Sequence, residues 1–254
     1  RGAASGRRAA GAPGMKDQMP LKLAARERAS FDNYVPGANL AVLEHLRRYT
    51  GSPGEPVLYL HGPDGSGRTH LVQAVCSAAA ARGQTTVRVG LTDTERLPLA
   101  ALDGLENLAV VCIEDLDAIA GQRTWEAALD QLCARLVARG GGLVMTGARV
   151  AVAAGFTHPG FAKRVAQAMD FALAPLDAAG FAALLAARAG RLGLALPREV
   201  AALLLNHCAD HPGRLIAALD ALERALPQAR GRLGVTGVRA LLRAEGLLAA
   251  PPSG

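Results

Sequence analysis

The residues with the clearest chemical spacing form a glycine-rich loop between Gly62 and Thr69. The loop matches the pattern Gly-x-x-x-x-Gly-Lys-Ser/Thr, except that Arg68 stands in place of the lysine. In such a loop, backbone N–H groups converge on phosphate oxygens, the following helix N-terminus adds positive potential, and the last hydroxyl binds Mg²⁺. We therefore expect a nucleotide triphosphate site, with Thr69 on the metal, rather than a structural glycine turn. The expected site residues are Gly62, Pro63, Asp64, Gly65, Ser66, Gly67, Arg68, Thr69 and His70.

Arg68 keeps the positive charge of the usual lysine but not its shape. A planar guanidinium with five donors cannot slide between the β- and γ-phosphates as a compact ammonium does. We expect nucleotide binding to persist while hydrolysis slows, so the loop predicts a nucleotide-holding protein before it predicts a fast ATPase. His70 beside the loop has two interpretations, a phosphate contact or, more simply, a packed or solvated imidazole.

A second chemical feature is the acidic pair of Glu114 and Asp115, which follows the apolar run 108–113. Sites of this kind need an acid at the end of a neighbouring buried strand to hold the water shell of the magnesium, and often a second carboxylate that orients the attacking water. We expect Glu114 to face the metal and Asp115 to take the water-activating position. The longer carboxylate comes first, an unusual order that is a second indication of weak hydrolysis. Without the loop, the pair would be an ordinary acidic start to a turn.

Strands and helices that alternate along the chain must position these residues. Continuous apolar runs predict strands that are buried on both faces, as in a parallel sheet covered by helices. The predicted strands are 57–60, 86–89, 108–113 and 143–146, and a helix is predicted at 124–138. The fold class is therefore α/β, with helices on both faces of a parallel sheet.

After Pro175 the strand signals stop and a small all-α lid domain is predicted. Capping residues and proline mark the starts of short helices. Asp177 and Thr236 are expected to cap the first and fourth helices, Pro197 to open the second, and Gly213 to precede the third. A hinge near Pro175 would set the lid over the carboxyl ends of the strands, where ligands of open parallel sheets bind. The expected divisions of the chain are 1–14, 15–30, 31–175, 176–248 and 249–254.

Composition excludes several classes of protein. The chain of 254 residues is half apolar, but no run approaches the ~18 consecutive apolar residues of a membrane span. Part of the net charge of +6 comes from Arg1, Arg7 and Arg8. They lie in a segment 1–14 that resembles no signal peptide and that we expect to be a disordered tail or an expression remnant. The 4 cysteines lack C-x-x-C spacing, so buried reduced thiols and residence in the cytoplasm are expected.

The order of loop, acidic strand end, threonine-ended strand and helical lid resembles the AAA+ ATPases. Within them the chain resembles the DnaA family of replication initiators, and most closely a shortened regulatory branch of that family. Residues 31–39 are similar to the adenine-contacting segment of the family, 111–115 to its Walker strand and 145–147 to the end of its sensor 1 strand. The likeness runs from about residue 18 to residue 242.

The resemblance implies roles for further residues. Tyr34 and Val35 would contact the adenine of bound ADP or ATP, and Thr146 would act as sensor 1. Arg164 falls at the arginine finger of the family, which acts in trans on the γ-phosphate held by another protomer. Arg214 falls at sensor 2 in the lid. Without the family, Arg164 is a solvated helix residue and Arg214 pairs with the acid one turn before it.

The segment Gln18-Met19-Pro20-Leu21-Lys22-Leu23 resembles the peptide that docks on the bacterial sliding clamp. Pro20 favours an extended backbone, on which Met19, Leu21 and Leu23 project to one side and suit a hydrophobic groove. Gln18 is the fourth expected clamp contact. The alternative is an N-terminal tail that folds onto its own domain.

The resemblance therefore implies a regulator that inactivates the initiator DnaA. It would bind the DNA polymerase III β sliding clamp and stimulate hydrolysis of the ATP on DnaA, without being an efficient ATPase of its own. It would meet DNA only through the clamp, meet no membrane, and be open to self-association. A DnaA-like initiator or helicase loader that engages DNA directly is the alternative, which the lack of a basic helix-turn-helix module after the lid helices disfavours. An autonomous ATPase motor is the third candidate.

Overall fold

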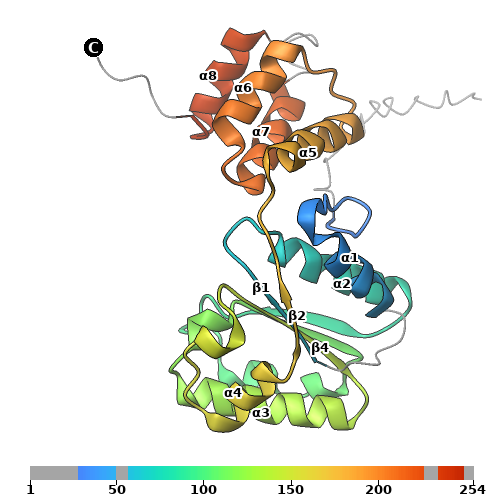
Figure 1. Ribbon diagram of the computed structural model, residues 1–254, viewed down its shortest axis with the longest axis vertical. Helices are drawn as coiled ribbons and strands as arrows, with labels where there is room; N and C mark the ends of the chain where they lie inside the picture. The colour runs from blue at the N-terminus through green and yellow to red at the C-terminus, as the bar shows by residue number, and fades with distance from the viewer. Residues whose placement is uncertain (1–27, 50–56, 226–233, 249–254) are drawn as a thin grey trace, which may run out of the picture.

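A computed structural model describes residues 28–49, 57–225 and 234–248 of the protein. Figure 1 shows an α/β domain with a helical domain stacked beyond one end of its sheet. The strands are β1 (Val57–His61), β2 (Thr86–Gly90), β3 (Val110–Glu114), β4 (Gly142–Gly147) and β5 (Met169–Ala172). The helices are α1 (Leu40–Tyr49), α2 (Arg68–Ala81), α3 (Arg123–Ala138), α4 (Pro159–Ala166), α5 (Ala178–Arg191), α6 (Arg198–Cys208), α7 (Pro212–Ala225) and α8 (Val235–Ala244). In this part of the chain, no helix is both long enough and apolar enough to cross a bilayer.

The five strands form one sheet in the order β2-β3-β4-β1-β5, and every pair of neighbours is parallel. This confirms the predicted α/β class, and β1 to β4 match the predicted strands to within a few residues. The fifth strand was not predicted as a separate element, because β5 lies at an edge and its residues alternate between half-buried and exposed. The apolar-run signal marked the central strands β3 and β4, whose residues are all buried.

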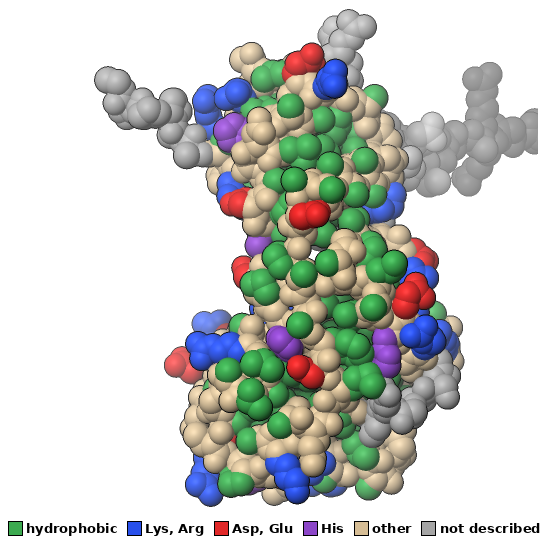
Figure 2. Space-filling view, in the orientation of Figure 1, with side chains coloured by type: hydrophobic (Ala, Val, Ile, Leu, Met, Phe, Trp, Pro, Cys, Tyr) green, Lys and Arg blue, Asp and Glu red, His purple; other side chains and the backbone are tan. Residues whose placement is uncertain are grey.

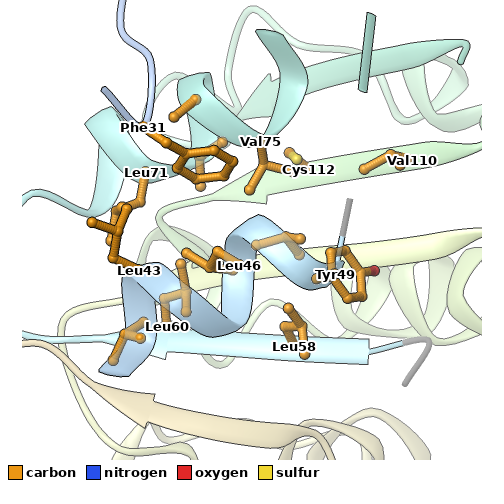
Figure 3. Packing of buried hydrophobic residues seen from close by; sticks show 14 of the residues in the cluster. Phe31, Leu43, Leu46, Tyr49, Leu58, Leu60, Leu71, Val75, Val110 and Cys112 are labelled. Atoms are coloured by element: carbon orange, nitrogen blue, oxygen red, sulfur yellow. The ribbon is translucent and has the colours of Figure 1, made fainter. Parts of the chain in front are cut away.

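Alternate residues of the central strands feed two cores, one on each face of the sheet. The first core lies under α1 and α2, and Figure 3 shows Leu46 of α1 and Val75 of α2 above Leu58 and Leu60 of β1. The second core lies under α3 and α4. Burial of each leucine side chain contributes about 1.5–3 kcal/mol to the stability of the fold. The cores on the two faces therefore hold the sheet rigid and fix the position at which each strand ends.

The helical domain has its own core from α5 to α8. Asp177 caps α5 as predicted, because its Oδ1 accepts a hydrogen bond of 2.7 Å from the N–H of Gly180. The prediction that Thr236 caps the last helix was wrong. Gly234, in an extended backbone conformation, takes the N-cap position of α8, so Thr236 lies within the first turn. The third lid helix begins at Pro212 and so includes Gly213, which was expected to precede it, because proline fits the first helical position.

Asn39 holds the connection between the two domains. Its Oδ1 accepts from the N–H of Ala174 at 2.8 Å, and its Nδ2 donates to the carbonyl of Ala174 at 2.8 Å and to the hydroxyl of Tyr34 at 3.3 Å. Asn39 is only 3% exposed. The side chain thus pairs with the chain leaving β5 as another backbone segment would. Figure 2 shows that the molecule narrows to a waist between the two domains.

Replacing Asn39 with aspartate should lower the free energy of unfolding by about 2 kcal/mol, measured by urea denaturation at pH 7. The carboxylate keeps the acceptor for the Ala174 N–H but sets an oxygen against the Ala174 carbonyl, where an N–H stood. Asn33→Asp is the matched control, because its lost bond, from Nδ2 to the Arg28 carbonyl, is exposed; a change within about 0.5 kcal/mol is expected there. Equal losses in both variants would contradict a special role for Asn39.

Candidate functional site

A cavity of about 470 Å³ lies between the glycine-rich loop and the helical domain, within the size range of pockets for small molecules and cofactors. Four segments surround it: the N-terminal segment, the loop with the start of α2, helix α5 and helix α7. Of the residues predicted at the nucleotide site, those lining the cavity are Tyr34, Val35, Asp64, Gly65, Ser66, Gly67, Arg68, Thr69 and His70. Those that do not line it are Gly62, Pro63, Thr146 and Arg214.

The loop conformation depends on Gly65 and Gly67, whose φ angles of +75° and +93° are left-handed. A Cβ on Gly67 would lie 2.8 Å from the ring of Tyr34, and a Cβ on Gly65 would lie 3.0 Å from Pro212. Side chains are therefore excluded at both positions, and the loop leads directly into the N-terminus of α2. Ser66 Oγ is buried and has no hydrogen-bond partner among the described residues. A phosphate group would fit here, because the narrow glycine loop, the N-terminus of α2 and the unsatisfied hydroxyl of Ser66 all face a potential anion site.

Arg68, Asp115 and Thr146 meet at the end of the sheet. Arg68 Nη1 lies 3.7 Å from Asp115 Oδ1, and the N–H of Asp115 donates to Thr146 Oγ1 at 3.1 Å. Asp115 has a left-handed backbone with φ +61°, the only positive φ of a non-glycine residue in the described chain. The three residues predicted as loop cation, water-activating acid and sensor 1 are thus brought together. Arg68, the cation, already faces the carboxylate of Asp115.

Glu114 is 4% exposed at its side chain and its Oε1 accepts from Arg88 Nη1 at 2.7 Å. Arg88 comes from β2, which pairs with β3 along its length. Arg88 was not predicted at the site, because a lone arginine in a short strand gives no signal until its neighbouring strand is known. Glu114, the acid expected to face the metal, is therefore already paired with the positive charge of Arg88.

Tyr34 and His70 form one side of the cavity. Their rings lie 5.3 Å apart, centre to centre, and the Tyr34 hydroxyl donates to the carbonyl of Ser66 at 3.4 Å. His70 Nε2 lies 3.0 Å from the carbonyl of Ser30, so it must carry the proton of the bond. Burial lowers the pKa of His70, which outweighs the opposite effect of that hydrogen bond. His70 is therefore the packed, neutral imidazole of the simpler interpretation, although it also lines the cavity.

Four lid residues with charged or titratable side chains line the cavity but were not predicted there: Arg188, Arg191, His211 and Asp220. Arg188 Nη2 lies 2.9 Å from Asp220 Oδ1, which joins α5 to α7 inside the wall. Burial, and then the nearby charge of Arg188, lower the pKa of Arg191. These partners lie on different helices, so no spacing along a single sequence reveals them.

His211 connects the lid with the glycine-rich loop. Its Nδ1 accepts from the N–H of Gly213 at 3.0 Å, which leaves the proton on Nε2, 3.4 Å from Asp64 Oδ2. The start of α7 thus rests directly on the loop.

Arg214 points elsewhere. It pairs with Asp210 and donates from Nη2 to the carbonyl of Leu247 at 3.0 Å. The ion pair that the residues alone suggested is the arrangement present. Arg214 thus connects α7 to the residues that follow α8.

Arg164 lies on α4, which covers the opposite face of the sheet from α2 (Figure 1). Its Nε lies 2.8 Å from Asp130 Oδ1 on α3, and its side chain is 32% exposed. Arg164 does not line the cavity of its own chain. An exposed apolar side chain, Val152 at 84%, stands on the short helix that packs against α4.

Glu126 fixes the start of α4 from inside the second core. It is fully buried and accepts from the N–H groups of His158 at 2.5 Å, Thr157 at 2.7 Å and Gly121 at 2.8 Å. Burial raises the pKa of Glu126, but these hydrogen bonds together outweigh it and leave the pKa below the ordinary value of 4.5. The buried carboxylate of Glu126 thus fixes the position of the start of α4, the helix that carries Arg164.

The expected clamp-binding residues lie outside the described part of the chain. These residues are Gln18, Met19, Leu21 and Leu23.

Two protein families match separate parts of the chain. Residues 58–145 match the ATPase family associated with various cellular activities (AAA), and residues 177–242 match the lid domain of Hda. The structure is similar to domain III of the replication initiation protein DnaA from Thermotoga maritima, with a TM-score of 0.72 and 16% identity over 85% of this chain and 96% of that one. The chain thus combines a region similar to the AAA family with a lid region similar to that of Hda, on the fold of DnaA domain III.

Two further DnaA structures share the fold of this chain. AMPPCP-bound DnaA from Aquifex aeolicus has a TM-score of 0.68 at 17% identity and covers 86% of this chain and 69% of its own. DnaA bound to AMPPCP and single-stranded DNA has a TM-score of 0.67 at 16% identity and covers 86% of this chain and 68% of its own. At these identities the likeness is one of fold.

Replacing Glu126 with glutamine should lower the free energy of unfolding at pH 7 by about 2–4 kcal/mol, because charged hydrogen bonds are lost and an amide N–H faces backbone donors. The pKa of Glu126 is depressed by folding, so its contribution is complete above pH 4.5 and lost as the pH falls through the lower folded-state value. The gap between variant and parent should therefore narrow in urea titrations below that pH. Glu44→Gln, at an exposed position of α1, should change stability by less than about 0.5 kcal/mol. A constant gap at every pH would contradict the assignment.

Proposed function

We propose that this chain is a nucleotide-bound regulator of replication initiation. Tethered to the DNA polymerase III β sliding clamp, it presents Arg164 to ATP held by DnaA and promotes hydrolysis of that ATP, which switches the initiator off. The observation that carries the proposal is that Arg164, on α4, is partly exposed and does not line the nucleotide cavity of its own chain. The Hda-like lid is a second, independent support.

An adenine nucleotide, ADP or ATP, would occupy the cavity with its phosphates on the glycine-rich loop. The left-handed glycines, the unsatisfied Ser66 hydroxyl and the neutral face of Tyr34 and His70 support this. Bound Mg²⁺ would neutralise phosphate charge, and Thr69 and Glu114 are the residues of this chain that would hold it. Glu114 would then share its carboxylate between the metal and Arg88.

Turnover by this chain alone should be slow. Asp115 is the residue expected to orient water, and its carboxylate faces the guanidinium of Arg68 at 3.7 Å. A carboxylate held by a cation is a weaker base, and Arg68 that pairs with Asp115 is withdrawn from the phosphates. The bound nucleotide would therefore set the angle between the domains, through the lid residues that touch it, more than it would be consumed.

Arg164 suits action in trans for an energetic reason. An ion pair at a partly exposed position is worth only about 0–1 kcal/mol, so the guanidinium leaves Asp130 at little cost when a γ-phosphate of another protein approaches. Asp130 meanwhile holds the side chain in position, 2.8 Å away. The exposed Val152, beside the same helix, offers apolar area for a partner.

The clamp contact rests on the resemblance of residues 18–23 alone. Met19, Leu21 and Leu23 would enter a hydrophobic groove of the clamp and Gln18 would supply the polar contact. The partners proposed are thus DnaA and the clamp, with DNA met through the clamp.

Gly67→Ala should weaken binding of a fluorescent ADP analogue at least about tenfold, an effect of ~1.4 kcal/mol. The added methyl would meet the Tyr34 ring at 2.8 Å and strain a φ of +93°. Gly83→Ala is the control, since its φ of +76° gives similar strain and nothing lies within 4 Å of the added atom. If both variants lose affinity equally, the loop has no special role in nucleotide binding.

Arg164→Ala should abolish acceleration of ATP hydrolysis on DnaA, measured as single turnover of ATP preloaded on DnaA with DNA-loaded clamp present. A finger of this kind contributes roughly 10³–10⁵-fold in other systems. Asp130→Asn is the matched control, because it weakens the same ion pair and keeps the guanidinium. It should retain most of the acceleration.

Equal loss in the Arg164 and Asp130 variants would reduce Arg164 to a structural residue. No acceleration by the folded, clamp-bound parent would overturn the proposed function. The second candidate, a DnaA-like initiator or helicase loader, would then be favoured, a possibility supported by the similar fold of a DnaA bound to single-stranded DNA.

A further inference from the structure

Cys76 of α2 and Cys112 of β3 lie with their sulfur atoms 3.5 Å apart. Neither is in a recognisable thiol motif, and 35 residues separate them in the sequence. They meet because α2 packs on the face of the sheet to which alternate residues of β3 point. Figure 3 shows Cys112 on its strand close beside the side chain of Val75, the neighbour of Cys76 in α2. All four cysteines are free thiols and three are buried, but no spacing in the sequence indicates that these two lie in contact.

Only one of the two sulfurs is accessible. Cys112 is completely buried, whereas Cys76 is half-buried. Cys76 lines a second cavity, of about 270 Å³, between the N-terminal segment, α2 and β2. A small molecule entering this cavity meets Cys76 first, with the Cys112 sulfur directly behind it.

The surroundings also favour the thiolate of Cys76. The hydrogen bond between Cys76 and Cys112 lowers the pKa of Cys76 most, and Thr86 and Arg88 lower it further against burial and the charge of Glu114, to about 6. Burial instead raises the pKa of Cys133 to about 12 and that of Cys208 above its ordinary value. Because the thiolate is the reactive form, those two cysteines serve as internal controls in the same chain.

We propose that Cys76 and Cys112 are an oxidisable dithiol, which a small hydroperoxide converts to an intramolecular disulfide. The Cys76 sulfur attacks the outer oxygen of the peroxide, the O–O bond breaks, and Cys76 becomes a sulfenic acid as water or an alcohol leaves. The Cys112 sulfur then displaces the hydroxyl, which departs as water with the thiol proton. Two electrons pass from the two sulfurs to the peroxide, and an S–S bond of ~2.05 Å replaces the contact.

The reaction needs a closure of about 1.5 Å between the sulfurs, which is the difference between the present contact of 3.5 Å and the bond length. The bond would join α2, which begins at Arg68, to β3, which ends at Glu114. It would thus cross-link the two elements that carry the loop cation and the buried acid.

The test uses the reduced full chain treated with stoichiometric hydrogen peroxide, alkylated, and mapped by non-reducing mass spectrometry. The Cys76–Cys112 peptide pair should be the main oxidation product and appear in monomeric protein. Cys133 and Cys208 should react at least about tenfold more slowly. In Cys112→Ser, dimedone should trap a sulfenic acid at Cys76, and in Cys133→Ser the disulfide should form as in the parent.

Oxidation of Cys133 or Cys208 at the rate of Cys76 would overturn the proposal, as would a folded parent in which both thiols survive the peroxide. Intermolecular disulfides as the main product would overturn it as well. The decisive measurement is made on the unaltered chain, so it holds even if a cysteine variant folds poorly.

Discussion

The parallel pairing of β3, β4 and β1 is the constraint from which the candidate site follows. Parallel strands end at the same edge of a sheet, so the loop after β1, the acids after β3 and the threonine of β4 are forced together. The two cores hold this arrangement from either face. The close contact of Arg68, Asp115 and Thr146 is therefore a property of strand order, in which local loop sequence has a smaller part.

Ion pairs set the electrostatic state of the site. Arg88 holds Glu114, Arg68 faces Asp115, and Arg188 holds Asp220 within the cavity wall. Each acid expected to act on metal or water thus has a cation beside it before any nucleotide arrives. Such pairing favours a site that stabilises bound charge over one that moves protons rapidly, in agreement with the slow turnover that arginine in the loop predicts.

Sequence reasoning was strongest where a signal is local. The glycine spacing, the apolar runs and the Asp177 cap depend on neighbours within a few residues, and the structure has them as predicted. The prediction that Thr236 is a helix cap was wrong because a threonine just inside a helix looks the same in sequence as one at its N-cap.

Contacts between distant elements were beyond a single sequence. Arg88 meets Glu114 across a strand pair, and Arg188 meets Asp220 across two helices. The edge strand β5 was missed as a separate element because half of its residues face outward. The roles assigned to Arg164, Tyr34 and Val35 came from a family resemblance, and those roles stay predictions.

The route by which the chain enters the lid couples the two domains mechanically. Leu173 donates its N–H to the carbonyl of His61 at 2.7 Å, and its own carbonyl lies 2.5 Å from where a Cβ on Gly62 would be. The segment that connects the sheet to the lid is thus hydrogen-bonded and closely packed at the start of the glycine-rich loop. His211 contacts the other side of that loop. A rotation of the lid would therefore displace the glycine-rich loop. Because the ligand is expected to bind on that loop, ligand release and lid rotation would share one free-energy barrier.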